Sequence, residues 1–192
     1  FRSAENSQTP YPNIWSGGVT ISKLMSDGRQ QIVGLQFAPD FMGRPFSKES
    51  DVTLEAATHV RLCSFPRSAL EDMLQESPEM EHKLHQQTLK ELNEARDWLL
   101  ALGRKTAVEK VASFILMIAS HIDPECDQST NQRVIELPMR RSDIADFLGL
   151  TTETVSRQLT HLRKRGIVQI ADRRVLTITS MTALKNASER QA

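Results

Sequence analysis

The segment RSDIADFLGLTTETVSRQLTHLRKR, residues 141–165, constrains the fold of this chain more than any other stretch. A short apolar stripe at Ile144, Ala145 and Leu148 precedes Gly149, where a tight turn between helices favours a residue that tolerates positive φ. A second stripe with helical spacing follows, formed by Leu150, Val155, Leu159 and Leu162. The pattern predicts a helix-turn-helix, a motif that places its second helix in the major groove of DNA.

The polar face of the second predicted helix carries the candidate base-reading residues. Glu153 and Arg157 are four residues apart and therefore project from one side of the helix. Arg can donate two hydrogen bonds to guanine O6 and N7, and Glu can accept one from cytosine N4. Ser156, beside Arg157, can add a contact to a base edge or a phosphate. The alternative for Glu153 and Arg157 is an ion pair on a solvated helix surface.

The run Glu153-Thr154-Val155-Ser156-Arg157 resembles the E-x-x-S-R recognition motif of the superfamily of the cyclic AMP receptor protein and the fumarate–nitrate regulator, which includes the FixK-type branch. The layout of that superfamily fits the chain from about Ile14 onward. The resemblance implies that Glu153, Ser156 and Arg157 contact the bases of a TTGA-type half-site, and that a homodimer binds a palindrome in double-stranded DNA. It also implies a cytoplasmic activator of low-oxygen genes, including those of nitrogen fixation and denitrification, that works with RNA polymerase.

Several residues around the motif are candidates for contacts with the DNA backbone. Arg140 stands where a helix favours an N-cap such as Ser, although Asp143 occupies the acidic position of a capping box. Two interpretations of Arg140 and Arg141 remain open, namely phosphate contact and simple solvation. The other backbone candidates are Thr152, Thr154, Thr160, Lys164, Arg173 and Arg174.

Arg173 and Arg174 lie in the turn of a predicted wing. Residues 167–170 and 175–178 read as its two strands after Gly166, a plausible helix stop, and residues 133–137 as a third strand. The two arginines either contact phosphates or belong to a hydrated hairpin turn. A protein-interaction module whose winged helix does not bind DNA is a competing interpretation of the whole region.

The distribution of charge favours DNA binding by the C-terminal region. The whole chain is neutral, with 24 basic and 24 acidic residues, which argues against a general nucleic-acid binder. From Met139 to the end there are 10 Lys and Arg against 5 Asp and Glu, whereas residues 1–103 carry 10 against 14. Phosphate attraction is therefore concentrated beside the predicted reading helix. No run of 18 apolar residues occurs, so no membrane partner is expected.

The N-terminal region reads as β structure. Alternating residues 19–25, an Asp27-Gly28 signal for a two-residue hairpin, and residues 31–37 predict two strands, and residues 52–57 and 59–65 predict a further strand pair. Residues 38–43 resemble the P-G-D-x-x-G turn of the superfamily's β-roll. No strand is evident before Ile14, which leaves open whether residues of the roll are missing from the N-terminus.

The family's cyclic-nucleotide cassette is not found in residues 44–50. Glu49 is not followed by the Arg-Ser/Thr-Ala that the resemblance requires for the ribose and the cyclic phosphate. We therefore expect the fold without a cyclic AMP site and without a cofactor. The alternative is a regulator of the same superfamily that is gated by a nucleotide or by haem.

A long helix is predicted between the two regions. Ser77-Pro78-Glu79 is a favourable helix start, and an a/d seam follows at Thr88, Leu92, Ala95, Leu99 and Leu102, with Leu84 extending it. A partner helix or packing within the chain can cover this seam, and the resemblance favours dimerisation. A second helix is expected over about residues 105–121, followed by a polar connection at 123–132. The predicted architecture is α+β: a β-roll over 1–76, a dimerisation helix over 77–103 and a winged helix over 104–192.

The remaining chemistry-bearing residues do not form a catalytic or metal-binding pattern. Cys63 alternates within an apolar run and is expected in the core, whereas Cys126 lies in a polar connection and is expected to be exposed. His82 and His85 are three residues apart, but no third ligand accompanies them, so no metal site is expected. No nucleophile has a recognisable base partner, so an enzyme is not expected.

Overall fold

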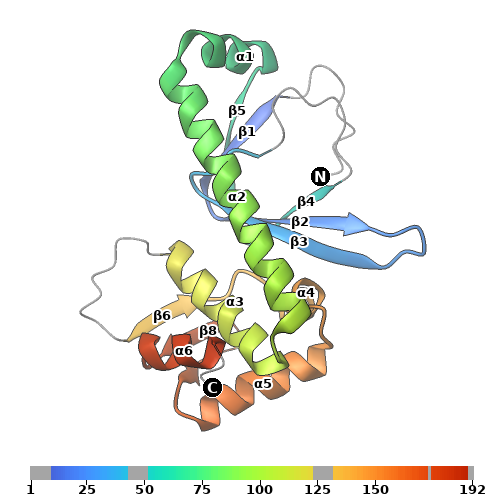
Figure 1. Cartoon of the computed structure of the whole chain (residues 1–192), viewed down its shortest axis with the longest axis vertical. Helices are drawn as coiled ribbons and strands as arrows, with labels where there is room; N and C mark the ends of the chain where they lie inside the picture. The colour runs from blue at the N-terminus through green and yellow to red at the C-terminus, as the bar shows by residue number, and fades with distance from the viewer. Residues whose placement is uncertain (1–9, 43–51, 123–131, 173, 190–192) are drawn as a thin grey trace. The chain divides into compact units, whose positions relative to one another are not determined.

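The computed structural model describes residues 10–42, 52–122, 132–172 and 174–189. Two compact units divide the chain, over residues 1–97 and 98–192. A single long helix, α2 (Pro78–Arg104), carries the chain from the first unit into the second (Figure 1). The mixture of an N-terminal β region, a long helix and a C-terminal helix-turn-helix confirms the predicted α+β class.

The described residues of the first unit form two small antiparallel sheets. In one, β1 (Tyr11–Ser16) pairs with β5 (Arg61–Phe65). In the other, β2 (Gly18–Leu24) lies between β3 (Gln30–Phe37) and β4 (Thr53–Ala56). The strand β1 begins at Tyr11, although the sequence gives no evident strand before Ile14. Its single buried aliphatic, Ile14, gives too short an alternation to be recognised in the sequence.

The prediction that the strands over 52–57 and 59–65 pair with each other is wrong. Both strands exist, but β4 pairs with β2 and β5 pairs with β1. The connection between them is bonded to the start of β2 instead of closing a hairpin: Ala57 N–H donates to the Gly18 carbonyl at 2.9 Å, and Gly18 N–H donates to Thr58 Oγ1 at 2.9 Å. These bonds direct β4 and β5 into different sheets.

The β2–β3 hairpin is confirmed, but its turn is longer than the predicted two residues. Met25 N–H donates to the Arg29 carbonyl at 2.8 Å, so the loop extends from Met25 to Arg29. Gly28 has φ of 87°, which accounts for the glycine. The Asp27 carboxylate accepts from both the backbone N–H and the guanidinium of Arg29, and this local pair extends the turn.

Cys63 is exposed, which contradicts its predicted place in the core. Alternation buries one face of a strand only when another layer covers it. In the part of the chain that the structure describes, β5 pairs with β1 alone, and its residues 61–64 are all exposed. The expected exposure of Cys126, and the polar connection over 123–131, lie outside the described residues.

Among the described residues of the first unit, two apolar clusters hold the strands and helices together. Ile14, Val19 and Met42 form one, inside the strands. The other joins Tyr11 of β1 to Leu70 and Leu74 of α1 (Arg67–Glu76), a helix that was not predicted from the sequence. Met80 and Leu84 of α2 pack against this second cluster, so the start of α2 is anchored in the first unit.

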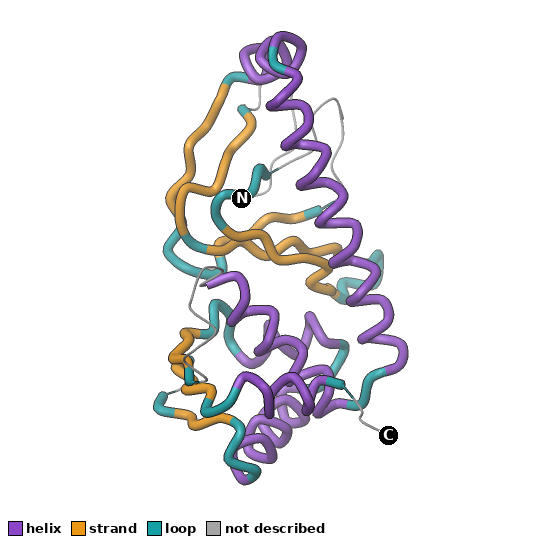
Figure 2. Tube along the Cα trace, turned by 60° about the vertical axis from the view of Figure 1, so that its left-hand side comes forward, coloured by secondary structure: helices purple, strands orange, loops and turns teal. Residues whose placement is uncertain are grey.

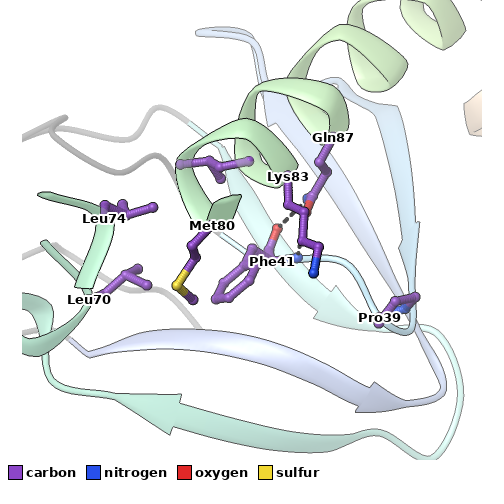
Figure 3. Close-up of a pocket in the computed structure, with 8 residues that line it drawn as sticks. Pro39, Phe41, Leu70, Leu74, Met80, Lys83 and Gln87 are labelled. Carbon is purple, nitrogen blue, oxygen red and sulfur yellow. Dashed lines mark hydrogen bonds between the residues drawn. The ribbon is translucent and has the colours of Figure 1, made fainter. Parts of the chain in front are cut away.

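A small cavity of about 240 Å³ lies beside the second cluster. Figure 3 shows Met80 between the leucines of α1 and Phe41, with Lys83 and Gln87 extending from α2. The polar side chains beside the cavity have partners within the protein. Gln87 donates to the Phe41 carbonyl and accepts from the Phe41 N–H, each at 3.2 Å. Lys83 forms an ion pair with Glu79 at 2.8 Å. The two bonds between Gln87 and Phe41 join α2 to the segment that follows β3.

In its described residues, the second unit packs four helices and the end of α2 with a three-stranded sheet. The helices are α3 (Ala107–Ile122), α4 (Arg141–Leu148), α5 (Thr152–Lys164) and α6 (Met181–Ser188). The strands β6 (Arg133–Glu136), β8 (Val175–Ile178) and β7 (Val168–Ile170) are antiparallel in that spatial order. Figure 2 shows the helices of this unit gathered on one side and its strands on the other.

The helix α3 lies at the centre of the second unit. It is in contact with α5, α6 and β6, and its buried residues include Val111, Phe114, Ile115 and Ile118. Phe147 of α4 packs edge-to-face against both Phe114 and Trp98, with ring centroids 5.8 and 4.6 Å away. This packing joins α4 to α3 and to the end of α2. Among the described helices, none is both long and apolar enough to cross a bilayer.

Candidate nucleic-acid interface

The first helix of the motif, α4, begins directly after Arg140. The Asp143 carboxylate accepts the Arg140 backbone N–H at 3.1 Å, which is the acidic half of a capping box. The other half requires an acceptor at position 140, and a guanidinium has none. Arg140 instead turns its Nε towards the same carboxylate at 3.4 Å and remains exposed. The helix start is therefore fixed by Asp143 alone.

The turn between α4 and α5 has the left-handed residue that the sequence predicts. Gly149 has φ of 61° and ψ of 41°, and the next residue, Leu150, donates its N–H to the Ala145 carbonyl at 3.0 Å. Ile144, Ala145 and Leu148 are buried, so the short apolar stripe packs inward. These features set the crossing of the two helices.

The second helix, α5, is capped and packed as a recognition helix requires. Thr151 Oγ1 accepts the Thr154 N–H at 3.1 Å, which stabilises the helix start. Val155, Leu159 and Leu162 are each at most 2 % exposed, so one face of α5 is held tightly in the core. The opposite face is therefore rigidly presented to solvent.

The exposed face of α5 carries Glu153 and Arg157 side by side. Both side chains are exposed, and within the described residues neither has an ion-pair or hydrogen-bond partner. The alternative interpretation, a salt bridge between the two, is thus not realised although their spacing allows it. The carboxylate and the guanidinium keep their full hydrogen-bonding capacity for another molecule.

Ser156 lies next to this pair and is half-buried. Its Oγ accepts a hydrogen bond from the Arg141 guanidinium at 3.2 Å, a contact between α4 and α5. Arg141 is half-buried as well, whereas Arg140 is exposed. The sequence could not indicate this contact, because it joins residues on two helices whose crossing angle is set by the core.

The other backbone candidates are distributed over α5 and the wing. Thr152 and Lys164 are exposed. Two threonines are engaged within the helix: the Thr154 hydroxyl bonds that of Thr151 at 2.9 Å, and the Thr160 hydroxyl donates to the Ser156 carbonyl at 3.0 Å. Arg174 is half-buried and directly precedes the last wing strand, β8. Arg173 lies outside the described residues.

The wing strands occur within one residue of their predicted positions. After α5 ends at Lys164, Gly166 adopts φ of 69° and turns the chain into β7. The strand β8 lies between β7 and β6, so the region 133–136 completes the sheet. The helix α6, which was not predicted, packs Leu184 and Ala187 onto the core beside α3.

The residues of the a/d seam occupy different environments along α2. Leu84 is half-buried in the cluster with Leu70 and Leu74, and Leu102 is half-buried, whereas Thr88 and Ala95 are exposed. Leu92 and Leu99 are also exposed, to 44 % and 71 %. Leu89 and Leu100 add further exposed apolar surface, to 59 % and 60 %, and were not included in the predicted seam.

Two domain families match the chain in the regions that the fold indicates. The Crp-like helix-turn-helix domain matches residues 109–187, and the cyclic nucleotide-binding domain matches residues 13–77. A probable transcriptional activator from Rhizobium leguminosarum bv. viciae is 53 % identical over 175 residues, which are 91 % of this chain and 72 % of that protein. The chain belongs to the CRP/FNR superfamily of transcription regulators.

Further relatives place it in the FixK-type branch of this superfamily. The activator FnrL of Cereibacter sphaeroides is 37 % identical over 96 % of this chain and 78 % of that protein. The solved structure of FixK2 from Bradyrhizobium japonicum superposes with a TM-score of 0.83 at 34 % identity, covering 98 % of this chain and 91 % of that one. Members of the superfamily regulate transcription and are not enzymes. The family expectation is therefore confirmed.

Proposed function

We propose that this regulator binds a TTGA-type palindrome in double-stranded DNA as a homodimer and activates transcription with RNA polymerase. The observation that carries the proposal is the pair Glu153 and Arg157, exposed and unpaired among the described residues, on the one face of α5 that the core leaves free. In the major groove, Arg157 reads guanine and Glu153 reads cytosine. Ser156 adds the third base-edge contact. A regulator of this kind acts in the cytoplasm.

Sequence-independent affinity comes from groups around this face. We assign phosphate contacts to Arg140, Arg141, Thr152, Thr154, Thr160, Lys164, Arg173 and Arg174. Lys164 supports the assignment best, because it is exposed at the end of α5. Thr154 and Thr160 are engaged within α5, so we expect smaller contributions from them. Each lysine or arginine that contacts a phosphate increases the salt dependence of binding, so the affinity falls more steeply as the salt concentration rises.

Two reading helices are needed for a palindrome, and α2 offers the surface that brings two chains together. Apolar side chains exposed on a helix are normally covered by a partner. The dimer seam we assign consists of Leu84, Thr88, Leu92, Ala95, Leu99 and Leu102, with Leu89 and Leu100 at its margins. Since Leu84 packs against α1, the close contacts of the seam are expected from Thr88 onward.

The regulated genes are proposed to be those of low-oxygen life. The relatives include nitrogen fixation regulation proteins FixK, one of them from Bradyrhizobium diazoefficiens at 36 % identity over 88 % of this chain and 70 % of that protein. We propose that cyclic AMP is not required, because Glu49 lacks the Arg-Ser/Thr-Ala that would follow it. Calorimetry with cyclic AMP and an absorption spectrum of the purified protein test this. Binding of the nucleotide, or a haem band, would favour the ligand-gated alternative.

The DNA-binding proposal is tested by selecting bound sites from a random duplex library and then measuring Kd by mobility shift. We expect a two-fold symmetric consensus. Arg157→Ala should weaken binding to it by about 1–3 kcal/mol and relax preference at one base pair of each half-site. Lys185→Ala is the matched control, since Lys185 is exposed on α6 and its loss removes the same charge. Equal weakening on every sequence would contradict base reading by Arg157.

The homodimer is tested by sedimentation equilibrium. Leu99→Glu places a charge in the proposed seam and should convert the dimer to a monomer at micromolar concentration. Val134→Glu is the control, because Val134 is 69 % exposed on β6, close to the 71 % of Leu99. A dimer that persists in Leu99→Glu, or an equal effect of both variants, would contradict the assigned seam.

A further inference from the structure

The contact between Arg141 and Ser156 gives the serine a fixed hydrogen-bonding role. We infer that Arg141 is a positioning residue that orients Ser156 as a hydrogen-bond donor towards DNA, so that Ser156 selects a base edge presenting an acceptor. The inference rests on the proposed function, because it assumes that the exposed face of α5 meets the major groove. It differs from that function by giving Arg141 an effect on specificity instead of a phosphate contact alone.

The chemistry of the two groups sets the direction of the bond. A guanidinium has five N–H donors and no acceptor, so the bond of 3.2 Å must run from Arg141 to a lone pair of Ser156 Oγ. The hydroxyl hydrogen of Ser156 therefore cannot point at Arg141. Within the described residues no acceptor receives it either, because Ser156 has no other side-chain hydrogen bond. The hydrogen remains available to an incoming molecule.

The surroundings hold this arrangement in place. Both side chains are half-buried between α4 and α5, whose crossing is fixed by the buried residues Ile144, Ala145 and Val155. The Ser156 backbone carbonyl accepts a hydrogen bond from the Thr160 hydroxyl at 3.0 Å. A charged donor also polarises the hydroxyl that accepts from it, which makes its remaining hydrogen a better donor.

A serine hydroxyl that already accepts one bond keeps its O–H and one lone pair, and a polarised O–H makes donation the stronger of its two remaining bonds. In the major groove, thymine O4, guanine O6 and N7 and adenine N7 are acceptors, whereas cytosine N4 is a donor. A freely rotating serine hydroxyl can bond to a donor or to an acceptor on a base edge, and it therefore contributes little to sequence specificity. With Arg141 on one of its two lone pairs and its O–H polarised by that bond, Ser156 should favour an acceptor at its base pair over cytosine N4.

The neighbouring arginine provides a natural control. Arg140 turns to Asp143 and has no contact with Ser156 among the described bonds. The variants Arg140→Met and Arg141→Met remove the same charge one residue apart. A phosphate role predicts similar behaviour for both, whereas the positioning role predicts loss of specificity only in Arg141→Met.

The first experiment measures Kd for the selected palindrome and for duplexes with each base pair of the half-site replaced. We expect Ser156→Ala and Arg141→Met to lose about 3- to 10-fold of discrimination at the same base pair, the value of one hydrogen bond. The double variant should lose no more discrimination than the worse single one. Uniform weakening across all duplexes in Arg141→Met, or losses that multiply, would overturn the inference. If the unchanged protein prefers no palindrome, the proposed function itself fails.

The second experiment needs no DNA, so it tests the effect of Arg141 on position 156 separately from the proposed DNA-binding function. Ser156→Cys is prepared with Cys63 and Cys126 replaced by Ser, and the pH dependence of its alkylation gives the thiol pKa. A neighbouring guanidinium should hold that pKa below the usual value of about 8.5. Arg141→Met in this background should return it, and Arg140→Met should not. A thiol pKa that is the same with and without Arg141 would overturn the inference, and thermal unfolding of each variant verifies that it is folded.

Discussion

Gly149, at the turn of the helix-turn-helix, allows a backbone cost to be separated from a packing cost. Its φ of 61° is left-handed, and an added Cβ would meet nothing within 4 Å. Gly149→Ala therefore causes no collision, and its cost is the left-handed conformation, about 1–2 kcal/mol. The variant recovers about 0.4–1 kcal/mol because alanine also restricts the unfolded chain. We expect a net loss of about 1 kcal/mol in the free energy of unfolding.

Gly103 provides a matched substitution with the opposite sign. It lies near the end of α2, has no positive φ, and likewise leaves open space around an added Cβ. Gly103→Ala should therefore stabilise the protein by about 0.5–1 kcal/mol, the usual gain for this change in a helix. Both variants add the same methyl group, so any difference between them reports backbone conformation.

The assay follows Trp98, whose ring packs 4.6 Å from that of Phe147 in the second unit. The chain has two tryptophans, so Trp15→Phe leaves Trp98 as the sole reporter. Urea titration of its fluorescence gives the stability of the unit that holds the turn. A loss of about 1 kcal/mol corresponds to about 4–8 °C in Tm for a domain of this size. If Gly149→Ala proves as stable as the parent, or if Gly103→Ala is equally destabilising, the reasoning is refuted.

Three further predictions follow from individual contacts. Thr151→Ala removes the acceptor of the Thr154 N–H and should cost about 1 kcal/mol in the same urea titration, whereas Thr151→Ser should restore most of it. Leu162→Ala empties a fully buried site on α5 and should cost about 2–5 kcal/mol; a cost below 1 kcal/mol would mean that the recognition helix is not held by this core. The hydrogen bond from Lys83, followed by its charge, lowers the pKa of Glu79 below the ordinary 4.5. This pair therefore stabilises the protein above pH 4.5 and loses its effect as the pH falls through the lowered pKa. NMR titration of Glu79 should show the lowered pKa, and Lys83→Gln should return it to the ordinary value.

Patterns with a strong local cause were predictable from the sequence. The turn at Gly149 and the buried stripe of α5 follow from φ preference and helical spacing, and both lie where they were expected. The start of α2 after Ser77 has the same origin: Pro78 is the first helical residue and Ser77 Oγ lies 3.4 Å from the Met80 N–H. Local rules of this kind need no knowledge of distant residues.

Features that depend on distant partners were missed or mispaired. The strands β4 and β5 were expected to pair with each other, and they separate because Gly18 bonds the segment between them. Cys63 was expected in the core, yet β5 has no covering layer among the described residues. The short helices α1 and α6 gave no clear periodic signal, since packing against their units stabilises them more than propensity does.

The sequence by itself determined the recognition motif and its family, because a helix-turn-helix is specified within some 25 residues by spacing, a left-handed turn and an exposed polar face. Only the tertiary structure decided how the polar groups on that face are used. It left Glu153 and Arg157 unpaired in the described part of the chain, and it brought Arg141 onto Ser156. The physical reason is that side-chain partners across two helices depend on their crossing, and the crossing is set by a core assembled from distant segments.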